Sequence, residues 1–258
     1  FPGPTGTNAV ETALKLARMT KKRSNIIAFT NGYHGLTMGA LAVTGNTFYR
    51  DDAFMTRSNV SFMPFDGYYG EKVNTIEIIR KHLTDPSSGI DLPAAMIIET
   101  IQAEGGVNVA RFEWLAELEK LCREFDILLI IDDIQVGNGR TGTFFSFERA
   151  GISPDIIVLS KSIGGGLPLA LVLLKPELDQ WKPGEHTGTF RGNNLAFVAS
   201  TEALSFWDND ELSQNIEKNS HIIQEALEKI RSKYDKLNMR IRGRGMMYGL
   251  DIPLHEFC

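Results

Sequence analysis

Short apolar runs alternate with amphipathic segments along most of the chain. Apolar runs of strand length occupy five stretches, Ile26–Phe29, Ala94–Glu99, Ile127–Asp132, Ile156–Ser160 and Ala170–Leu174. Nearly continuous runs of this kind are typical of strands that are buried on both faces of a sheet. The alternation of such strands with helices predicts the α/β class, with a mostly parallel sheet covered by helices.

The segments between these runs carry hydrophobic residues every three to four positions, which indicates amphipathic helices. The predicted helices are Ala9–Arg18, Val73–Leu83, Phe112–Phe125, Leu195–Trp207 and Glu211–Tyr234. We place a domain boundary after the last and longest of them. Residues 1–235 are then a large domain, and residues 236–258 begin a smaller C-terminal domain.

Composition narrows the possible function classes. The 258 residues are 43% hydrophobic and 23% charged, which is ordinary for a soluble globular protein. The net charge of −5 and the lack of a Lys/Arg cluster argue against nucleic-acid binding. No apolar run approaches membrane-spanning length, so we expect no membrane partner. The two cysteines, Cys122 and Cys258, lack metal-ligand spacing and suit a reducing cytoplasm.

Both ends of the chain suggest a fragment of a longer protein. The first residue is Phe rather than Met, and Phe1–Pro4 is a turn signal rather than a leader. Near the other end, Met246–Ile252 predicts a strand with no partner after it. We therefore expect sequence to be missing on both sides, and we expect these residues alone to be inactive.

Lys161 is the most informative single residue. It follows the apolar strand 156–160 and precedes the glycine run 164–166. Ligands of open α/β folds bind at the carboxyl ends of the strands, which is where this amine is expected. A lysine at a rigid strand end, partly removed from water, can act as a nucleophile, whereas most lysines are solvated surface residues.

Asp132 follows another apolar strand. A carboxylate carried to a sheet edge by such a strand needs a charged or hydrogen-bonded partner. A pyridinium nitrogen and a magnesium ion are two such partners. The next residue, Asp133, is expected to support the site rather than to contact a ligand.

The segment Thr5–Asn8 precedes the first predicted helix. Thr7 or Asn8 would cap that helix, and Gly6 would let backbone N–H groups approach an anion. The positive end of the helix dipole favours a phosphate at this position. A plain capped helix is the simpler alternative.

Residues 137–142 have the G-x-G-x-x-G spacing of dinucleotide-binding loops. Such a fingerprint follows its strand at once and opens a helix. Here Asp132–Gln135 intervenes, and Thr143–Phe147 does not predict a helix. We therefore interpret residues 137–142 as a glycine-rich turn beside a ligand. A nucleotide-binding oxidoreductase or a non-catalytic binding module would rest on this motif alone.

Two loops follow strands at the same sheet edge. Tyr33 could stack on a flat ring, although singly it is more often a packed turn residue, and His34 a polar surface residue. The loop Glu99–Gly106 offers two carboxylates, including Glu104. Taken alone, such a loop is more often acidic and solvated.

Together these motifs resemble the class III, fold type I aminotransferases that depend on pyridoxal 5′-phosphate (PLP). The resemblance covers essentially the whole chain and rests on the order and spacing of the motifs. They are Thr5–Thr7, Glu99–Gly106, Asp132–Gln135, Gly139–Gly142, Lys161 and Arg242–Gly249. One departure is Ala103, where the family usually has glycine.

The resemblance implies roles around the reactive part of the cofactor. Lys161 forms a Schiff base with PLP, and Asp132 pairs with the pyridine nitrogen. Gln135 lies near the 3-oxygen of the ring, and His34 is counted among the cofactor-binding residues. Glu104 contacts the substrate side, where relatives pair this glutamate with a carboxylate-binding arginine that we expect outside residues 1–258.

The remaining implied roles concern the ring faces, the phosphate and a second subunit. Ile134 and Tyr33 sandwich the ring, and the backbone of Gly6 and Thr7 holds the phosphate. Thr189 reaches the phosphate of the neighbouring subunit's cofactor. The resemblance therefore implies a homodimer, or a higher homo-oligomer, with shared active sites and small amino acids as substrates.

Within the family, the closer resemblance is to the diaminobutyrate transaminase subgroup. It is carried by Phe62–Gly70, Asp85–Pro93, Asp132–Gln135 and Phe190–Phe197. The implied reaction moves an amino group from glutamate to aspartate 4-semialdehyde, giving 2,4-diaminobutyrate, as in ectoine biosynthesis. An ornithine, acetylornithine or 4-aminobutyrate type of aminotransferase and a PLP-dependent aminomutase remain alternatives.

Overall fold

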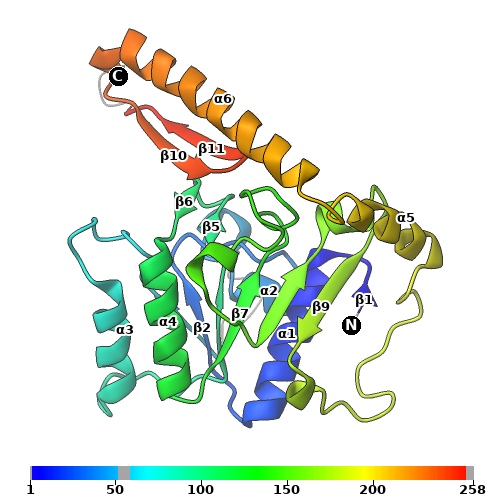
Figure 1. The fold of residues 1–258 in the computed structure, drawn as a ribbon. Coiled ribbons are helices and arrows are strands. Elements are labelled where there is room, and N and C mark those ends of the chain that lie inside the picture. The colour runs from blue at the N-terminus through cyan, green and yellow to red at the C-terminus, as the bar shows by residue number, and fades with distance from the viewer. Residues whose placement is uncertain (1, 52–58, 254–258) are drawn as a thin grey trace.

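The computed structural model describes residues 2–51 and 59–253 of the chain. Its main sheet has seven strands in the order β1–β9–β8–β7–β4–β2–β3 (Figure 1). These strands are β1 (Pro2–Gly3), β2 (Ile26–Phe29), β3 (Val60–Met63), β4 (Ala95–Ile98), β7 (Leu128–Asp132), β8 (Ile156–Leu159) and β9 (Ala170–Leu174). The predicted α/β class is confirmed.

Helices and two small ribbons complete the described part of the chain. The α-helices are α1 (Gly6–Lys21), α2 (Met38–Ala42), α3 (Thr75–Thr84), α4 (Phe112–Glu124), α5 (Asn194–Ser205) and α6 (Glu211–Lys233). Short 3-10 helices are η1 (Thr47–Tyr49), η2 (Glu148–Ala150), η3 (Lys161–Gly164), η4 (Pro176–Leu178) and η5 (Asp235–Leu237). The ribbons pair β5 (Ile101–Gln102) with β6 (Asn108–Val109), and β10 (Arg240–Arg244) with β11 (Met247–Asp251).

The sheet is parallel in its centre and antiparallel at one side. The neighbours β3, β2, β4, β7 and β8 all run in the same direction. Strand β9 runs antiparallel to β8, and β1 runs antiparallel to β9. Only residues 160–169 join β8 to β9, and this connection is too short for the crossover that a parallel pair requires. The carboxyl ends of the five central strands therefore meet at one edge.

Successive residues of a central strand pack on opposite faces of the sheet. On β2, Ile26 and Ala28 pack with the cluster that includes α1, whereas Ile27 and Phe29 pack with α3 and α4. Figure 1 shows these helices in layers around the sheet. Burial of one such side chain stabilises the fold by about 1.5–3 kcal/mol. The strand ends are therefore held firmly between two packed layers.

Several elements differ from the sequence-based prediction. Strand β3 and helix α2 are short, and neither was predicted. Strand β10 was missed because arginine alternates with other residues along it, without an apolar pattern. It pairs with β11, so the strand predicted at Met246–Ile252 has a partner that precedes it in the chain. Pro2–Gly3 forms an edge strand rather than a turn, a position that proline tolerates.

The C-terminal elements lie beyond the sheet edge. Helix α6 runs along the β10–β11 ribbon (Figure 1). Two arginines of β10 join this ribbon to the sheet side: Arg242 Nη1 donates to Asn108 Oδ1 over 2.7 Å, and Arg244 Nη2 donates to the Ser146 carbonyl over 3.2 Å. The domain boundary after residue 235 stays a prediction.

The cysteines and the length of the apolar helices were both considered in the sequence. Cys122 is a free cysteine buried in α4, and burial raises the pKa of its thiol, which makes it unreactive. Cys258 lies outside the described residues. Among residues 2–51 and 59–253, no helix combines the length and the apolar character that crossing a membrane requires.

Candidate active site

One cavity of about 450 Å³ opens at the carboxyl edge of the central strands. It contains nine of the ten residues that the sequence predicted for the site: Gly6, Thr7, Tyr33, His34, Glu104, Asp132, Ile134, Gln135 and Lys161. Gly35, Leu36, Glu99 and Ser160 complete its lining. Thr189 does not line this cavity and is exposed on a loop before α5.

Asp132 ends β7 and is only 4% exposed. Its Oδ2 lies 2.7 Å from His34 Nδ1, and its Oδ1 accepts the Ile134 N–H over 3.2 Å. His34 is itself 3% exposed, and its backbone N–H donates to Thr44 Oγ1 over 3.0 Å. The interpretation of His34 as a polar surface residue is therefore wrong, because the fold brings it to the end of β7 as the partner of Asp132.

Glu99 is a second buried carboxyl in the cavity, immediately after β4. Its Oε2 accepts the backbone N–H of Tyr33 over 2.9 Å. Burial, and then the nearby charge of Asp132, raise the pKa of Glu99 well above its ordinary value. The buried wall of the cavity thus pairs Asp132 with a carboxyl that favours its neutral form. The sequence placed Glu99 in a motif but gave it no role.

Lys161 follows β8 with its backbone in the left-handed region, at φ 54°. A side chain other than glycine costs about 1–2 kcal/mol in this conformation. Lys161 Nζ donates to Gln135 Oε1 over 2.8 Å, and Gln135 Nε2 donates to Glu104 Oε1 over 3.2 Å. These three side chains form one hydrogen-bonded row along the cavity.

The sequence also predicted that Lys161 would be partly removed from water. In the single chain, Lys161 is instead exposed, as are Gly165, Gly166 and Leu167 after it. The amine therefore lies at the open side of the cavity. Any removal from water must come from something other than the described residues of one chain.

The N-terminus of α1 forms another wall of the cavity. The helix begins at Gly6 rather than at Ala9, and its N-cap is Thr5, with no side-chain cap. The prediction of Thr7 or Asn8 as the cap is wrong, because Thr7 lies inside the helix and its Oγ1 is 2.7 Å from Thr37 Oγ1. The first N–H groups of a helix have no partner within it and, with the helix dipole, favour an anion.

Close packing explains why position 6 is glycine. A Cβ on Gly6 would lie 2.8 Å from Ile134 Cδ1, which is closer than van der Waals contact allows. The helix start therefore approaches the Ile134 side chain directly. This places the free N–H groups of α1 beside the loop that follows Asp132.

The glycine-rich residues 137–142 form turns and do not open a helix, as predicted. They do not line the cavity, and the interpretation of a turn beside a ligand stays a prediction. Trp207 and Ile216 cover this turn, and a Cβ on Gly139 would lie 2.8 Å from both side chains. The turn therefore connects the site to α6 by packing.

Asp133 lies behind the cavity rather than in it. It is 1% exposed, and Ser146 donates to it from both its side-chain hydroxyl and its backbone N–H. Thr100 Oγ1 in turn donates to Ser146 Oγ over 2.6 Å. Burial raises the pKa of Asp133 to about 7, although the bonds from Ser146 act in the opposite direction. Asp133 thus anchors the loop that carries Ile134 and Gln135.

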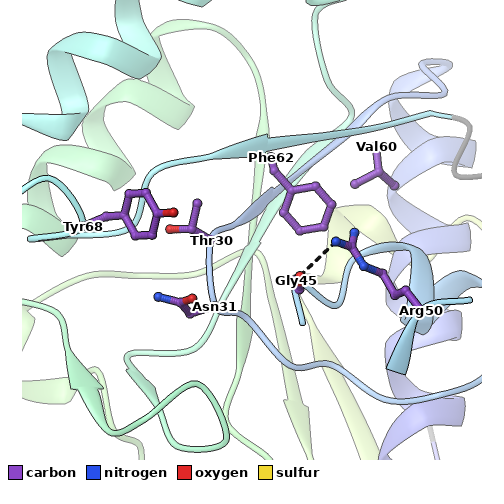
Figure 2. A pocket seen from close by; sticks show the side chains of 7 residues that line it. All are labelled: Thr30, Asn31, Gly45, Arg50, Val60, Phe62 and Tyr68. Carbon is purple, nitrogen blue, oxygen red and sulfur yellow. Dashed lines mark hydrogen bonds between the residues drawn. The ribbon is translucent and has the colours of Figure 1, made fainter. Parts of the chain in front are cut away.

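A second cavity, of about 410 Å³, was not anticipated from the sequence. Figure 2 shows Arg50 beside the Phe62 ring, with its guanidinium 5.1 Å from the ring centroid and donating to the Gly45 carbonyl over 2.9 Å. Asn31 and Gly45 of this cavity also line a hollow that includes Tyr33 and Glu104 of the first site. The two cavities are therefore connected by shared wall residues.

Residues 1–256 match the aminotransferase class-III family. The chain is 70% identical over 254 residues to the diaminobutyrate–2-oxoglutarate transaminase of Wolinella succinogenes, covering 98% of this chain and 60% of that protein. It is 58% identical to the enzyme of the same name from Bordetella parapertussis, covering 97% of this chain and 58% of that protein. The chain thus spans about 60% of the length of these relatives.

Solved structures agree with these sequence relatives. The ornithine aminotransferase of Toxoplasma gondii superimposes with a TM-score of 0.84 at 28% identity, covering 98% of this chain and 59% of that one. An aminotransferase of Bacillus anthracis gives a TM-score of 0.85 at 28% identity, over 98% of this chain and 60% of that one. Fold, sequence and the lysine at the sheet edge agree: the chain belongs to the class III aminotransferases.

Proposed function

We propose that the protein containing this chain is a PLP-dependent diaminobutyrate–2-oxoglutarate transaminase. It would move an amino group between glutamate and aspartate 4-semialdehyde, with 2,4-diaminobutyrate and 2-oxoglutarate on the other side. The observation that carries this proposal is the meeting of Lys161, Asp132 and the start of α1 in one cavity. The substrate pair is supported by the names of relatives that are 58–70% identical.

The residues of the cavity fit PLP. The volume of about 450 Å³ is in the range of small-molecule sites. The start of α1 at Gly6 and Thr7 suits the phosphate, and Asp132 suits a protonated ring nitrogen. Tyr33 and Ile134 would cover the two ring faces. PLP in the active site of the Toxoplasma gondii relative supports the same cofactor here.

When bound, PLP supplies the electron sink that makes amino transfer possible. Asp132 would hold the proton of the ring nitrogen, and its bond to His34 fixes the orientation of the carboxylate. Lys161 Nζ would hold the cofactor covalently. The same amine is the group of the cavity that would hold and move a proton at the substrate Cα.

The open side of the cavity has its own part in this scheme. Gln135 accepts a hydrogen bond from Lys161 Nζ and would hold the amine toward the 3-oxygen of the ring. Glu104, bonded to the Gln135 amide, would face the substrate. If Lys161 Nζ leaves Gln135, a substrate amine would find the same hydrogen-bond acceptor free.

We also propose a cytoplasmic homodimer with shared active sites. Thr189 is exposed and lies outside its own cavity, as a residue that serves a neighbouring subunit must. Phe190, Leu195 and Val198 are 86%, 72% and 71% exposed, and such apolar exposure is typical of interfaces. A second subunit would also cover Lys161 and exclude water from it.

An amino-transfer assay with the intact natural protein tests the proposed function. With PLP and 2-oxoglutarate present, 2,4-diaminobutyrate should give glutamate at least about tenfold faster than ornithine or 4-aminobutyrate, at equal concentration. Faster transfer from either competitor would move the assignment to another class III type. Conversion of diaminobutyrate without glutamate would indicate an aminomutase, and nicotinamide binding without PLP binding would favour the oxidoreductase alternative.

A further inference from the structure

Residues 179–193, called the strap below, connect η4 to α5 and contain Thr189. The strap has no helix or strand, and it passes beside α1 rather than packing into the sheet. Most of its side chains are exposed. Its position must therefore depend on a few specific contacts with the rest of the chain.

His186 makes the central contact between the strap and α1. Its Nε2 lies 2.9 Å from Oγ1 of Thr12, a buried residue of α1. The same nitrogen lies 3.0 Å from Nη2 of Arg191, at the far end of the strap. One ring atom thus joins two parts of the strap to the helix.

Ring stacking and a second polar contact add to the contact between His186 and α1. The Trp181 ring stacks on the His186 ring, with centroids 5.0 Å apart and planes inclined by 22°. Lys15 Nζ of α1 lies 5.2 Å from the Trp181 ring centroid and donates to the Glu185 carbonyl over 2.8 Å. Together Thr12, Lys15, Trp181, His186 and Arg191 form what we call the clamp.

Arg191 extends the clamp toward the turn that carries Thr189. A Cβ on Gly188 would lie 3.1 Å from Arg191 Nε, and a Cβ on Gly3 would lie 3.4 Å from Arg191 Nη1. The guanidinium is therefore packed between the turn before Thr189 and strand β1. Fixing Arg191 fixes this turn.

The chemistry of the contact determines the state of His186. A guanidinium only donates hydrogen bonds, so Nε2 is the acceptor in the contact with Arg191, and the ring is neutral with its proton on Nδ1. The Thr12 hydroxyl, whose oxygen also lies 2.8 Å from the Asn8 carbonyl, then turns its proton toward Nε2. Burial, and then the charges of Arg191 and Lys15, lower the pKa of His186, which favours the same state. The other charged residue of the strap at this point, Glu185, bonds to the Lys182 backbone N–H.

We propose that His186 is a positioning residue that docks the strap on α1 and thereby fixes Thr189 for the neighbouring subunit's active site. This rests on the proposed function, in which Thr189 binds the phosphate of that subunit's PLP. Helix α1 then serves two active sites at once. Its first turn holds the phosphate of its own subunit, and Thr12 holds the strap that completes the other site.

Hydrogen exchange of the strap in the intact natural protein tests the docking itself. Replacing His186→Ala should speed exchange of residues 184–192 by about tenfold, the effect of losing one hydrogen bond to a charged group. His186→Gln should stay near the wild type, because the amide oxygen can accept from Arg191 in place of Nε2. Wild-type exchange in His186→Ala would overturn the docking role.

The equilibrium dissociation constant of PLP tests what the docking is for. Thr189→Ala and His186→Ala should each raise it by about tenfold, and the double variant should be no weaker than Thr189→Ala alone. Losses that add in the double variant would overturn action through Thr189. A wild-type constant in Thr189→Ala would contradict the shared site of the proposed function, while the exchange measurement would still decide whether His186 docks the strap.

A fluorescence titration tests the protonation state of His186. A protonated imidazole quenches a stacked indole, so Trp181 emission should fall with acid, with a midpoint below the ordinary histidine value of about 6.5. The change should vanish in His186→Gln and in Trp181→Phe. A titration that persists in His186→Gln would contradict the assignment of the neutral acceptor.

Discussion

The sheet-edge cavity and the strap hold their residues in different ways. In the cavity, Asp132 and His34 are 4% and 3% exposed and bond to each other between packed layers of the core. In the strap, Thr189 and Phe190 are exposed, and the clamp around His186 is what ties them to α1. One chain thus holds the cavity residues within its own core, whereas under the proposed function the strap depends on docking and on assembly with a second subunit.

The largest expected effect is at Asp132, on the cavity side of this comparison. Asp132→Asn should lower amino transfer by about a hundred- to ten-thousandfold, because the amide cannot hold the charge that the ring nitrogen requires. The matched control is Asp126→Asn, an exposed aspartate just before the other end of the same strand. Steady-state rates for both variants check this, and equal rates for Asp132→Asn and the wild type would refute the role of Asp132.

The next effect concerns the buried carboxyl of Asp133 behind the cavity. The pKa of Asp133 is raised to about 7, so the folded state binds this proton more tightly than the unfolded state. Protonated Asp133 therefore stabilises the folded state. This contribution is complete below the ordinary carboxyl pKa of about 4 and is lost as the pH rises through about 7. On the order of 4 kcal/mol of unfolding free energy should therefore be lost from this group between pH 4 and pH 8.

Urea unfolding at pH 5 and pH 8 measures this dependence. The wild type should be less stable at pH 8, and Asp133→Asn should reduce the difference. Part of the pH dependence should remain in Asp133→Asn, because the pKa of Glu99 is also raised. Equal pH dependence in the wild type and in Asp133→Asn would exclude Asp133 as the source.

A moderate effect is expected where α1 meets the loop after Asp132. Gly6→Ala would place its Cβ 2.8 Å from Ile134 Cδ1 and should weaken PLP binding by about tenfold, with overpacking that costs about 1–3 kcal/mol of stability. Ile134→Val removes the clashing methyl group. The double variant should recover part of the affinity, and if it does not, the contact is not what limits position 6.

The smallest expected effect on the fold is at the strap. Phe190 is 86% exposed, so Phe190→Ala should change the unfolding free energy of one chain by less than about 0.5 kcal/mol. Phe147, 6% exposed in the core, is the contrast, because its replacement by alanine should cost about 3–5 kcal/mol. Urea unfolding compares the two. Sedimentation of Phe190→Ala should in addition show more monomer than the wild type.

Local sequence patterns predicted the parts of the site that follow strands. Lys161 and Asp132 could be placed because each ends an apolar run, and parallel strands end at one edge. The contact of His34 with Asp132 could not be predicted, since it joins residues 98 positions apart, and Glu99 was given no role. The exposed state of Lys161 was also missed, because it depends on what covers the edge.

Three further features of the structure, in β9, β10 and the clamp, do not follow from hydrophobic patterns. The antiparallel course of β9 follows from the short connection 160–169 and could have been read from its length. Strand β10 alternates arginine with other residues, and its pairing with β11 gives a role to residues that show no hydrophobic period. The clamp at His186 joins the strap to Thr12 across 174 positions, and nothing in the local sequence marks this contact.

The absorbance spectrum of the intact natural protein with PLP shows whether Lys161 binds the cofactor covalently. It is recorded before and after addition of 2,4-diaminobutyrate, beside Lys161→Ala and the strap control Lys182→Ala. We expect a visible band, distinct from free PLP, that shifts when the amine is added, persists in Lys182→Ala and is absent in Lys161→Ala. A wild-type band in Lys161→Ala, or no such band in the wild type, would contradict it.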